Sequence, residues 1–214
     1  MVASQVHLVR HGEVFNPERV LYGRLPGFGL SPLGAKMAAA AAAELVDRGR
    51  PVVSIISSPL QRTLESAAPL AAAFNLPLTT DERVMEPTNR FEGTRLSGPG
   101  GALRDPRNWP SLVNPLRPSW GEPFRSIADR MLAAIDAAWR SVDDGDVVLV
   151  SHQLPIWMVH RALAGERLAH DPRKRRCELS SITTLSWRGE GFVESGYANP
   201  AAHLQVLATD VGAV

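Results

Sequence analysis

This sequence of 214 amino acids contains little cysteine and little lysine. Cys177 is the only cysteine, which excludes an intramolecular disulfide framework. Lys36 and Lys174 are the only lysines, so every other cation among the 23 Lys and Arg residues is an arginine. The 22 Asp and Glu residues leave a net charge of +1. Proteins that mainly coat nucleic acid or an anionic membrane carry a large basic excess, so the charge balance argues against that class.

Long apolar runs are also missing. The most apolar stretch, 37–46, is shorter than a bilayer-spanning helix and is mostly alanine, which is the best helix former. The first residues lack the basic region and apolar stretch of a secretory signal, and the first apolar run already contains His7 and Arg10. The sequence therefore predicts a cytoplasmic protein without a membrane partner.

Strand-like and helix-like patterns alternate along the chain. Short apolar runs at 6–9, 52–56 and 147–150 predict buried strands, and 78–85 is a weaker extended segment. Helices are predicted at 31–48, 60–74, 124–141 and 155–163, and a terminal hairpin at 181–187 and 192–197. Ser31 is the predicted cap of the first helix. Together these elements predict a single α/β domain, residues 1–214, with a mostly parallel central sheet flanked by helices.

A segment rich in proline and glycine interrupts this alternation at about residues 93–123. Regular structure is not expected there, and loops of this length in a compact domain usually form lids or substrate-binding elements. Trp109, Trp120 and Phe124 either line an apolar part of a binding pocket or hold the loop against the core.

Chemically active side chains directly follow the predicted strands. They are Arg10-His11-Gly12-Glu13 after the first strand, Ser57-Ser58-Pro59-Leu60-Gln61-Arg62 after the second, Glu86 after the weak third segment, and Ser151-His152 after 147–150. In open α/β sheets, ligands bind beyond the carboxyl ends of the strands. We therefore expect two histidines, two arginines and a carboxylate to meet in one site.

These motifs resemble those of the histidine phosphatase superfamily, also called the phosphoglycerate-mutase-like family. The resemblance rests on Leu8-Val9-Arg10-His11-Gly12-Glu13, Ser57-Ser58-Pro59-Leu60-Gln61-Arg62-Thr63-Leu64-Glu65-Ser66-Ala67, Gly121-Glu122 and Val150-Ser151-His152, which occur in the family's order. The Pro/Gly-rich segment and the C-terminal end are not covered. The resemblance implies that His11 becomes phosphorylated, that Arg10, Arg62 and His152 hold the phosphoryl group, and that Glu86 donates a proton.

Physical chemistry gives these roles a reason. Phosphoryl transfer needs an in-line nucleophile and cations around the equatorial oxygens. Arg10 and Arg62 would disfavour the imidazolium form of His11, and their guanidiniums would bind a phosphate dianion by paired hydrogen bonds. A partly desolvated carboxyl close to the phosphate would have the raised pKa of a general acid. Glu86 would protonate the leaving alkoxide and later activate the water that hydrolyses the phosphohistidine.

Several assignments have alternatives. The family usually continues after its proton donor with a glycine and a tryptophan before a Glu-Gly pair. The run here is Glu86-Pro87-Thr88-Asn89-Arg90-Phe91-Glu92-Gly93, which lacks both and is one residue shorter. Glu92 is therefore the alternative donor. Without the other motifs, His11 could be an ordinary loop histidine and His152 a core histidine. Arg62 could be a solvated residue of a helix.

Three residues of the loop after the first strand are predicted to bind substrate. Asn16 lies one position before the phosphate-contacting asparagine often seen in the family, and Gly23 and Arg24 follow in the same loop. Arg24 would bind a second anionic group on the substrate; an ordinary surface arginine is the alternative.

No metal, cofactor or nucleic-acid partner is predicted. His7 and His11 would share one strand face, but no cysteine pair or His-Glu-x-x-His segment supplies further ligands. Residues 173–176 are four successive cations, and such runs are usually a solvated face. No aromatic residues interleave with them to stack on bases.

The function predicted from these features is metal-independent hydrolysis of a small phosphorylated metabolite. A phosphoglycerate-mutase-type transfer is the alternative, and a catalytically silent phosphate-binding module is a third interpretation. The family's mutases carry an arginine pair and a lysine in their middle insertion, whereas only the scattered Arg95, Arg104, Arg107 and Arg117 occur here. A silent module would be expected to lack one of the five groups, and all five are present. The substrate and the oligomeric state, with a homodimer as one option, stay open.

Overall fold

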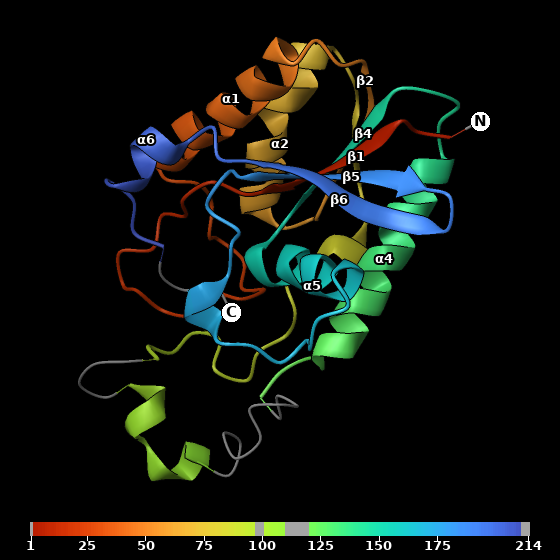
Figure 1. Ribbon diagram of the computed structural model, residues 1–214. Helices are drawn as coiled ribbons and strands as arrows, with labels where there is room; N and C mark the ends of the chain where they lie inside the picture. The colour runs from red at the N-terminus through yellow and green to blue at the C-terminus, as the bar shows by residue number, and fades with distance from the viewer. Residues whose placement is uncertain (1, 97–100, 110–119, 211–214) are drawn as a thin grey trace.

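The chain folds around a six-stranded sheet with the order β3-β2-β4-β1-β5-β6 (Figure 1). The computed structural model describes residues 2–96, 101–109 and 120–210. The parallel strands are β1 (Gln5–Arg10), β2 (Val52–Ser57), β3 (Leu78–Thr80) and β4 (Asp146–Ser151). Strand β5 (Ile182–Arg188) is antiparallel to β1 and forms a hairpin with β6 (Gly191–Ala198). The predicted single α/β domain with a mostly parallel sheet is confirmed.

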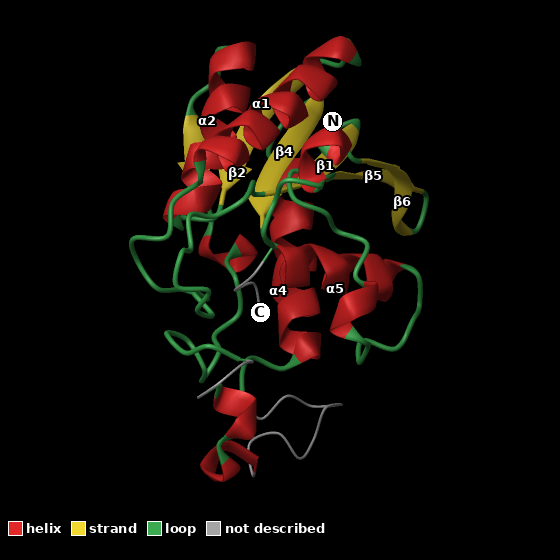
Figure 2. Cartoon of the chain, turned by 90° about the vertical axis from the view of Figure 1, so that its left-hand side faces the viewer, coloured by secondary structure: helices red, strands yellow, loops and turns green. Residues whose placement is uncertain are grey.

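Helices cover both faces of this sheet, as Figure 2 shows from the side. They are α1 (Pro32–Asp47), α2 (Gln61–Phe74), α4 (Phe124–Arg140), α5 (Gln153–Leu163) and the short α6 (Ala202–Gln205). Because side chains alternate along a strand, Val9 and Val150 pack with α1 and α2, whereas Leu8 and Leu149 pack with α4 and α5. Helix α1 begins as predicted, since the Ser31 hydroxyl accepts a hydrogen bond from the Gly34 amide at 2.9 Å.

The segment predicted as extended at 78–85 is a strand only in its first half. The Asp81 side chain accepts a hydrogen bond from the Arg83 amide at 2.8 Å, and a 3-10 turn follows at Glu82–Val84. Such a side chain offers the backbone an alternative to the sheet ladder. The chain therefore turns away from the sheet edge just before Glu86.

The Pro/Gly-rich segment predicted at 93–123 lies partly outside the described residues, which omit 97–100 and 110–119. Its described part forms two short 3-10 turns, at Ala102–Arg104 and Pro106–Asn108. Trp120 packs against a small cluster of Leu21, Phe91 and Ala102, so it holds the loop against the body of the protein. The Trp109 side chain is 57% exposed.

The carboxyl ends of β1, β2 and β4 lie at one edge of the sheet, where the long loops gather (Figures 1 and 2). Within the described ranges, no helix combines the length and apolar character that crossing a bilayer requires.

Candidate active site

Five buried side chains meet at this edge of the sheet: Arg10, His11, Arg62, Glu86 and His152. Arg10 ends β1, and Arg62 lies in the first turn of α2. His152 follows β4 and precedes α5. One potential ligand atom from each of His11, Glu86 and His152 lies within 4.8 Å of the other two.

Strand pairing brings these residues together. Arg10 of β1 pairs with Ser151 of β4, so the residues that follow each strand are neighbours. The His11 amide donates to the Ser151 carbonyl at 3.1 Å, and the Ser58 amide donates to the Val150 carbonyl at 2.9 Å. A Cβ atom on Gly12 would lie 2.3 Å from the Gly34 carbonyl oxygen, so only glycine allows the loop to pass this close to α1.

The His11 ring is held in its neutral form. Its Nδ1 lies 2.7 Å from the Gly12 carbonyl oxygen, which can only accept a hydrogen bond. Nδ1 therefore carries the proton, and Nε2 has a lone pair. Burial lowers the pKa of His11 well below its ordinary value, and the charges of Arg62 and Arg10 lower it further. His11 Nε2 has no hydrogen-bond partner among the described residues.

The two arginines are anchored at their ends. Arg10 donates to the Cys177 carbonyl at 2.7 Å and to the Asp210 carboxylate at 2.6 Å. Burial disfavours its charge, but the charge and the hydrogen bond of Asp210, with smaller contributions from Cys177 and Tyr22, together outweigh burial and raise the pKa of Arg10. Arg62 donates to the Gly23 carbonyl at 2.8 Å, and its guanidinium carbon lies 4.7 Å from the centre of the Tyr22 ring. The Nε atoms of both arginines have no partner in the part of the chain that the structure describes.

Glu86 and His152 form a loose pair. A Glu86 carboxylate oxygen lies 3.4 Å from Nδ1 of His152, and the other ring nitrogen lies 2.9 Å from the Ser58 hydroxyl. Burial raises the pKa of Glu86 to about 7, although the charges of Arg62 and Arg175 oppose this shift. Burial also lowers the pKa of His152 well below its ordinary value. Glu86 can therefore release and recover a proton near neutral pH.

The carboxylate of Glu92, the alternative proton donor, is hydrogen-bonded to the backbone. Its carboxylate accepts hydrogen bonds from the amides of Arg24 at 3.1 Å and Asn89 at 3.2 Å. Gly23 has a φ of +42°, and a Cβ atom there would lie 2.2 Å from a Glu92 carboxylate oxygen. Gly23 thus acts in this structure through its carbonyl, which holds Arg62.

The other two predicted substrate-binding residues lie in different places. Arg24 lies beside Glu86, because its Nε donates to the Glu86 carbonyl at 2.6 Å. Asn16 closes its own loop: its side-chain amide donates to the Val20 carbonyl at 2.8 Å and accepts from the Val20 amide at 3.2 Å. Asn16 also lines a pocket of about 260 Å³ whose walls include Glu13 and Thr209 but none of the five clustered residues.

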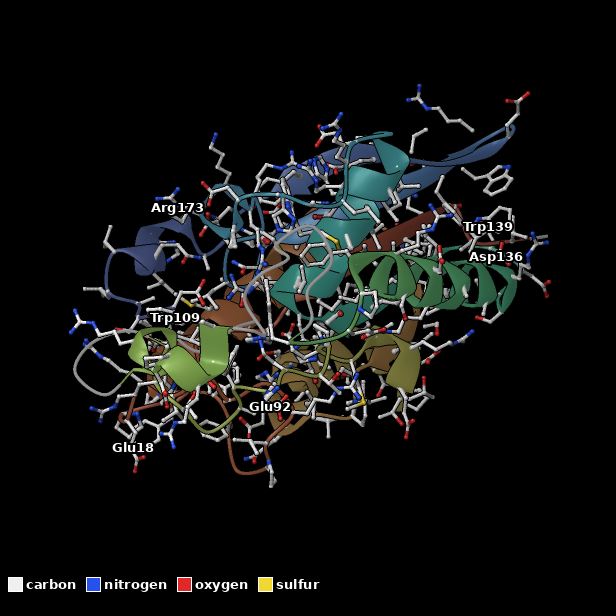
Figure 3. All side chains as sticks on the ribbon, turned by 90° about the horizontal axis from the view of Figure 1, so that it is seen from below. Glu18, Glu92, Trp109, Asp136, Trp139 and Arg173 are labelled. Carbon is white, nitrogen blue, oxygen red and sulfur yellow. The ribbon has the colours of Figure 1, made fainter. Side chains whose placement is uncertain are left out.

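Two residues at this site were not singled out from the sequence. Asp210, near the C-terminus, contacts Arg10. Arg175 belongs to the run at 173–176 that was interpreted as a solvated face. This interpretation suits Arg173, which is 88% exposed and pairs with Asp171 (Figure 3). It does not suit Arg175, which is partly buried and donates to His170 at 2.9 Å and to the Gln153 side chain at 3.2 Å. No local pattern distinguishes Arg175 from its basic neighbours.

The electrostatics of this cluster suit an anion better than a cation. His11, Glu86 and His152 could offer three ligands to a metal ion. However, the charges of Arg10 and Arg62 reach all three residues, as the shifts of their pKa values show. Two guanidiniums repel a cation and attract a phosphate dianion.

Comparisons with known proteins show which family this chain is similar to. The sequence profile of the histidine phosphatase superfamily (branch 1) matches residues 6–200. The uncharacterized protein Rv0525 of Mycobacterium tuberculosis is 54% identical over 200 residues, which cover 93% of this chain and 98% of that protein. The probable phosphoglycerate mutase GpmB of Yersinia pestis is 30% identical over 216 residues, covering 96% of this chain and 97% of that protein.

A solved structure shows the same fold. It is the phosphoserine phosphatase of Entamoeba histolytica in complex with 3-phosphoglyceric acid. The TM-score is 0.75 at 21% sequence identity, covering 94% of this chain and 98% of that one. Together with the profile match over most of the chain, these findings show that the protein belongs to the histidine phosphatase superfamily.

Proposed function

We propose that this protein hydrolyses phosphomonoesters of a small metabolite through a phosphohistidine intermediate on His11. One observation carries the proposal: the Nε2 lone pair of a buried, neutral His11 lies in a cluster with two guanidiniums and a carboxyl whose pKa is raised to about 7. Nucleophile, anion-binding groups and proton donor are the parts that phosphoryl transfer to a side chain requires.

The reaction proceeds in two displacements. In the first, His11 Nε2 attacks phosphorus and the bond to the ester oxygen breaks, while protonated Glu86 gives its proton to the leaving alkoxide. In the second, Glu86 takes a proton from water, the resulting hydroxide attacks phosphorus, and the P–N bond breaks to release phosphate. Arg10, Arg62 and His152 hold the phosphoryl oxygens through both steps.

A mutase reaction is the second candidate, favoured by the similarity to the probable phosphoglycerate mutase. The hydrolase is preferred because two arginines of the 93–123 segment, Arg95 and Arg107, form contacts elsewhere. Arg107 is 90% exposed and pairs with Asp105, and Arg95 donates to the Glu18 carbonyl at 2.8 Å. Arg117 lies outside the described residues. A mutase would convert 3-phosphoglycerate only with a bisphosphate primer, whereas a hydrolase would release inorganic phosphate without one.

The direct test is a screen of phosphorylated metabolites together with trapping of the intermediate. The wild-type protein is incubated with a 32P-labelled substrate, without added metal and with a chelator, and quenched rapidly. We expect a labelled adduct that is acid-labile and base-stable and that maps to His11. His11→Ala should give neither adduct nor turnover, whereas the matched variant His203→Ala, in exposed α6, should give both. Label on serine, or activity that disappears with the chelator, would overturn the mechanism. Binding of phosphate without any hydrolysis would instead support the silent module.

A further inference from the structure

Two neutral imidazole rings lie next to each other in the candidate site. The ring centres of His11 and His152 are 5.2 Å apart. Burial lowers the pKa of each ring well below its ordinary value, so each carries one proton at neutral pH. A ring nitrogen with the proton can only donate a hydrogen bond, whereas one with a lone pair can accept a hydrogen bond or attack phosphorus. The role of each ring therefore depends on which of its nitrogens faces the substrate.

The two rings turn different nitrogens to the protein. Nδ1 of His11 lies 2.7 Å from the Gly12 carbonyl oxygen, which leaves Nε2 for phosphorus. His152 is arranged the other way, because its Nε2 lies 2.9 Å from the Ser58 hydroxyl. Its Nδ1 lies 3.4 Å from a Glu86 oxygen and has no hydrogen-bond partner of normal geometry among the described residues. Nδ1 is thus the atom of His152 that is available to a phosphoryl oxygen.

The hydroxyl of Ser58 decides which nitrogen of His152 carries the proton. Ser58 is fully buried, and the Leu60 amide donates to its oxygen at 3.4 Å. An amide N–H cannot accept, so within the described ranges the hydroxyl hydrogen has a single acceptor, Nε2 of His152. A proton on Nε2 would leave the hydroxyl hydrogen buried without an acceptor, which is unfavourable. Nε2 therefore has the lone pair, and the proton is on Nδ1.

The backbone holds Ser58 rigidly beside this ring. Its amide donates to the Val150 carbonyl at 2.9 Å, and Val150 lies in β4 two residues before His152. Its carbonyl accepts hydrogen bonds from the hydroxyls of Thr63 at 2.9 Å and Ser57 at 2.8 Å. The hydroxyl and the ring that it contacts are thus positioned by the same strand.

We propose that Ser58 is a positioning residue, which donates a hydrogen bond to Nε2 of His152 and thereby keeps the proton on Nδ1, facing the phosphoryl group. This inference rests on the proposed function, since it assigns a role within the same reaction. A phosphoryl oxygen only accepts hydrogen bonds, so the other tautomer would turn a lone pair toward the anion. His11 and His152 then carry the proton on the same nitrogen but present opposite atoms to the phosphate, a lone pair and an N–H.

The same tautomer also protects the proton of Glu86. Glu86 is the carboxyl nearest to Nδ1 of His152, at 3.4 Å. If Nδ1 had a lone pair, protonated Glu86 could donate to it instead of to the leaving oxygen. With the proton already on Nδ1, the ring can only donate toward Glu86, and the carboxyl proton stays available for the alkoxide.

The direct test reads the tautomer without turnover. The protein is labelled with 15N in its histidine rings and studied by NMR at pH 7.5 without substrate, and the His152 signals are assigned by their loss in His152→Gln. We expect a protonated Nδ1 and an unprotonated Nε2 in the wild-type protein. In Ser58→Ala both signals should shift toward the opposite tautomer. Ser58→Thr, which keeps the hydroxyl, should retain the wild-type tautomer.

Kinetics with p-nitrophenyl phosphate complete the test. Ser58→Ala should lower kcat/KM roughly 10- to 100-fold, as the loss of a correctly placed hydrogen-bond donor to an anion does. Ser58→Thr should recover most of this loss. Ser57→Ala is the matched control, because Ser57 is also fully buried and its hydroxyl donates to the Ser58 carbonyl without contacting His152. It should lower the melting temperature but leave the tautomer and kcat/KM nearly unchanged.

Three results would overturn the inference. One is a protonated Nε2 in the wild-type protein, a measurement that requires no variant to fold. The others are a folded Ser58→Ala with unchanged tautomer and kcat/KM, and a Ser57→Ala that loses as much activity as Ser58→Ala. Failure of the proposed function is distinguishable, because it would leave turnover independent of His11 while the ring signals still show the proton on Nδ1 of His152.

Discussion

Two buried pairs of a histidine and a carboxylate lie at opposite ends of the central strands. His7 and Asp146 form the pair at the start of β4, with their closest atoms 3.2 Å apart. His152 and Glu86 form the pair beyond its end, with their closest atoms 3.4 Å apart. All four side chains are fully buried, so burial alone does not distinguish the two ends.

The pair at the start of β4 is saturated with hydrogen bonds. The other nitrogen of His7 lies 3.0 Å from the Thr184 hydroxyl, and Arg50 donates to both oxygens of Asp146. Burial by itself would raise the pKa of Asp146, but these bonds outweigh it and lower the pKa to about 2. Each polar atom is thus occupied, and the pair stabilises the fold.

The pair beyond the end of β4 is left open. Among the described residues, neither oxygen of Glu86 has a hydrogen-bond partner that meets normal geometry, and burial raises its pKa to about 7. Similar residue pairs therefore serve the fold where their polar atoms are hydrogen-bonded, and are candidates for chemistry where these atoms have no partner.

Replacing a histidine at each end of the central strands should distinguish the two ends most clearly. We expect His11→Ala to lower kcat by roughly 10⁴-fold or more, because the nucleophile is lost. His7→Ala, at the saturated end, should lower the melting temperature and leave kcat per folded molecule nearly unchanged. Steady-state kinetics and thermal unfolding of both variants check this. A His7→Ala protein that is folded but inactive would contradict the division of roles.

Glu86→Gln should slow the hydrolysis of alkyl phosphates by roughly 10²- to 10⁴-fold. p-Nitrophenyl phosphate should be affected less, because its leaving group needs little protonation. In the wild-type protein, kcat/KM should fall as the pH rises above about 7, where Glu86 loses its proton. This limb should be absent from the pH profile of the variant. Equal loss on both substrates would argue against Glu86 as the acid.

The two carboxylates should also have opposite effects on stability. The pKa of Glu86 rises from 4.5 to about 7 on folding, so its ionisation destabilises the fold as the pH increases through this window. Glu86→Gln should therefore be more stable than the wild-type protein at pH 8, by on the order of 3 kcal/mol.

Asp146→Asn should be less stable than the wild-type protein by roughly 3 kcal/mol at pH 7, because Arg50 and His7 lose their partner. The pKa of Asp146 is lowered on folding from 3.8 to about 2, so its contribution is present above about pH 4 and is lost as the pH falls toward 2. Urea unfolding across pH checks both variants. If Glu86→Gln and Asp146→Asn both stabilised the protein at pH 8, or both destabilised it, the two carboxylates would not have opposite effects on stability.

The smallest effect is expected at Asp210, whose carboxylate contacts Arg10 where a phosphate would bind. Asp210→Asn should lower the inhibition constant of inorganic phosphate roughly two- to fivefold, since the contact is partly exposed and such pairs are weak. Asp136→Asn, at the far end of α4 (Figure 3), should have no effect. Weaker phosphate binding in Asp210→Asn would show that Asp210 positions Arg10 instead of competing for it.

Local sequence patterns predicted most of the secondary structure. The helix expected at 31–48 is α1 at Pro32–Asp47, and the strand expected at 147–150 is β4 at Asp146–Ser151. Caps and apolar periodicity act within a few residues, so they can be read locally. The turn at Glu82–Val84 was missed, since one aspartate side chain diverted an extended run.

The members of the candidate site could be named because four of them directly follow strands or begin the next helix. Arg175 and Asp210 could not be named, because each reaches the cluster from a segment far from the motifs. Three of the four cations at 173–176 are arginines of identical chemistry, and only the path of the backbone decides which one turns inward.

The amino-acid sequence is sufficient to predict an alternating α/β chain and the side chains that follow each strand, because these depend on neighbours a few residues away. The three-dimensional fold is needed to show that β1 lies beside β4, that the carboxylate of Asp146 is hydrogen-bonded while that of Glu86 is not, and that Arg175 lies against His170 and Gln153. The scarcity of lysine does not predict these arrangements, since the charge and pKa of a group depend on its burial and on cations far away in the chain.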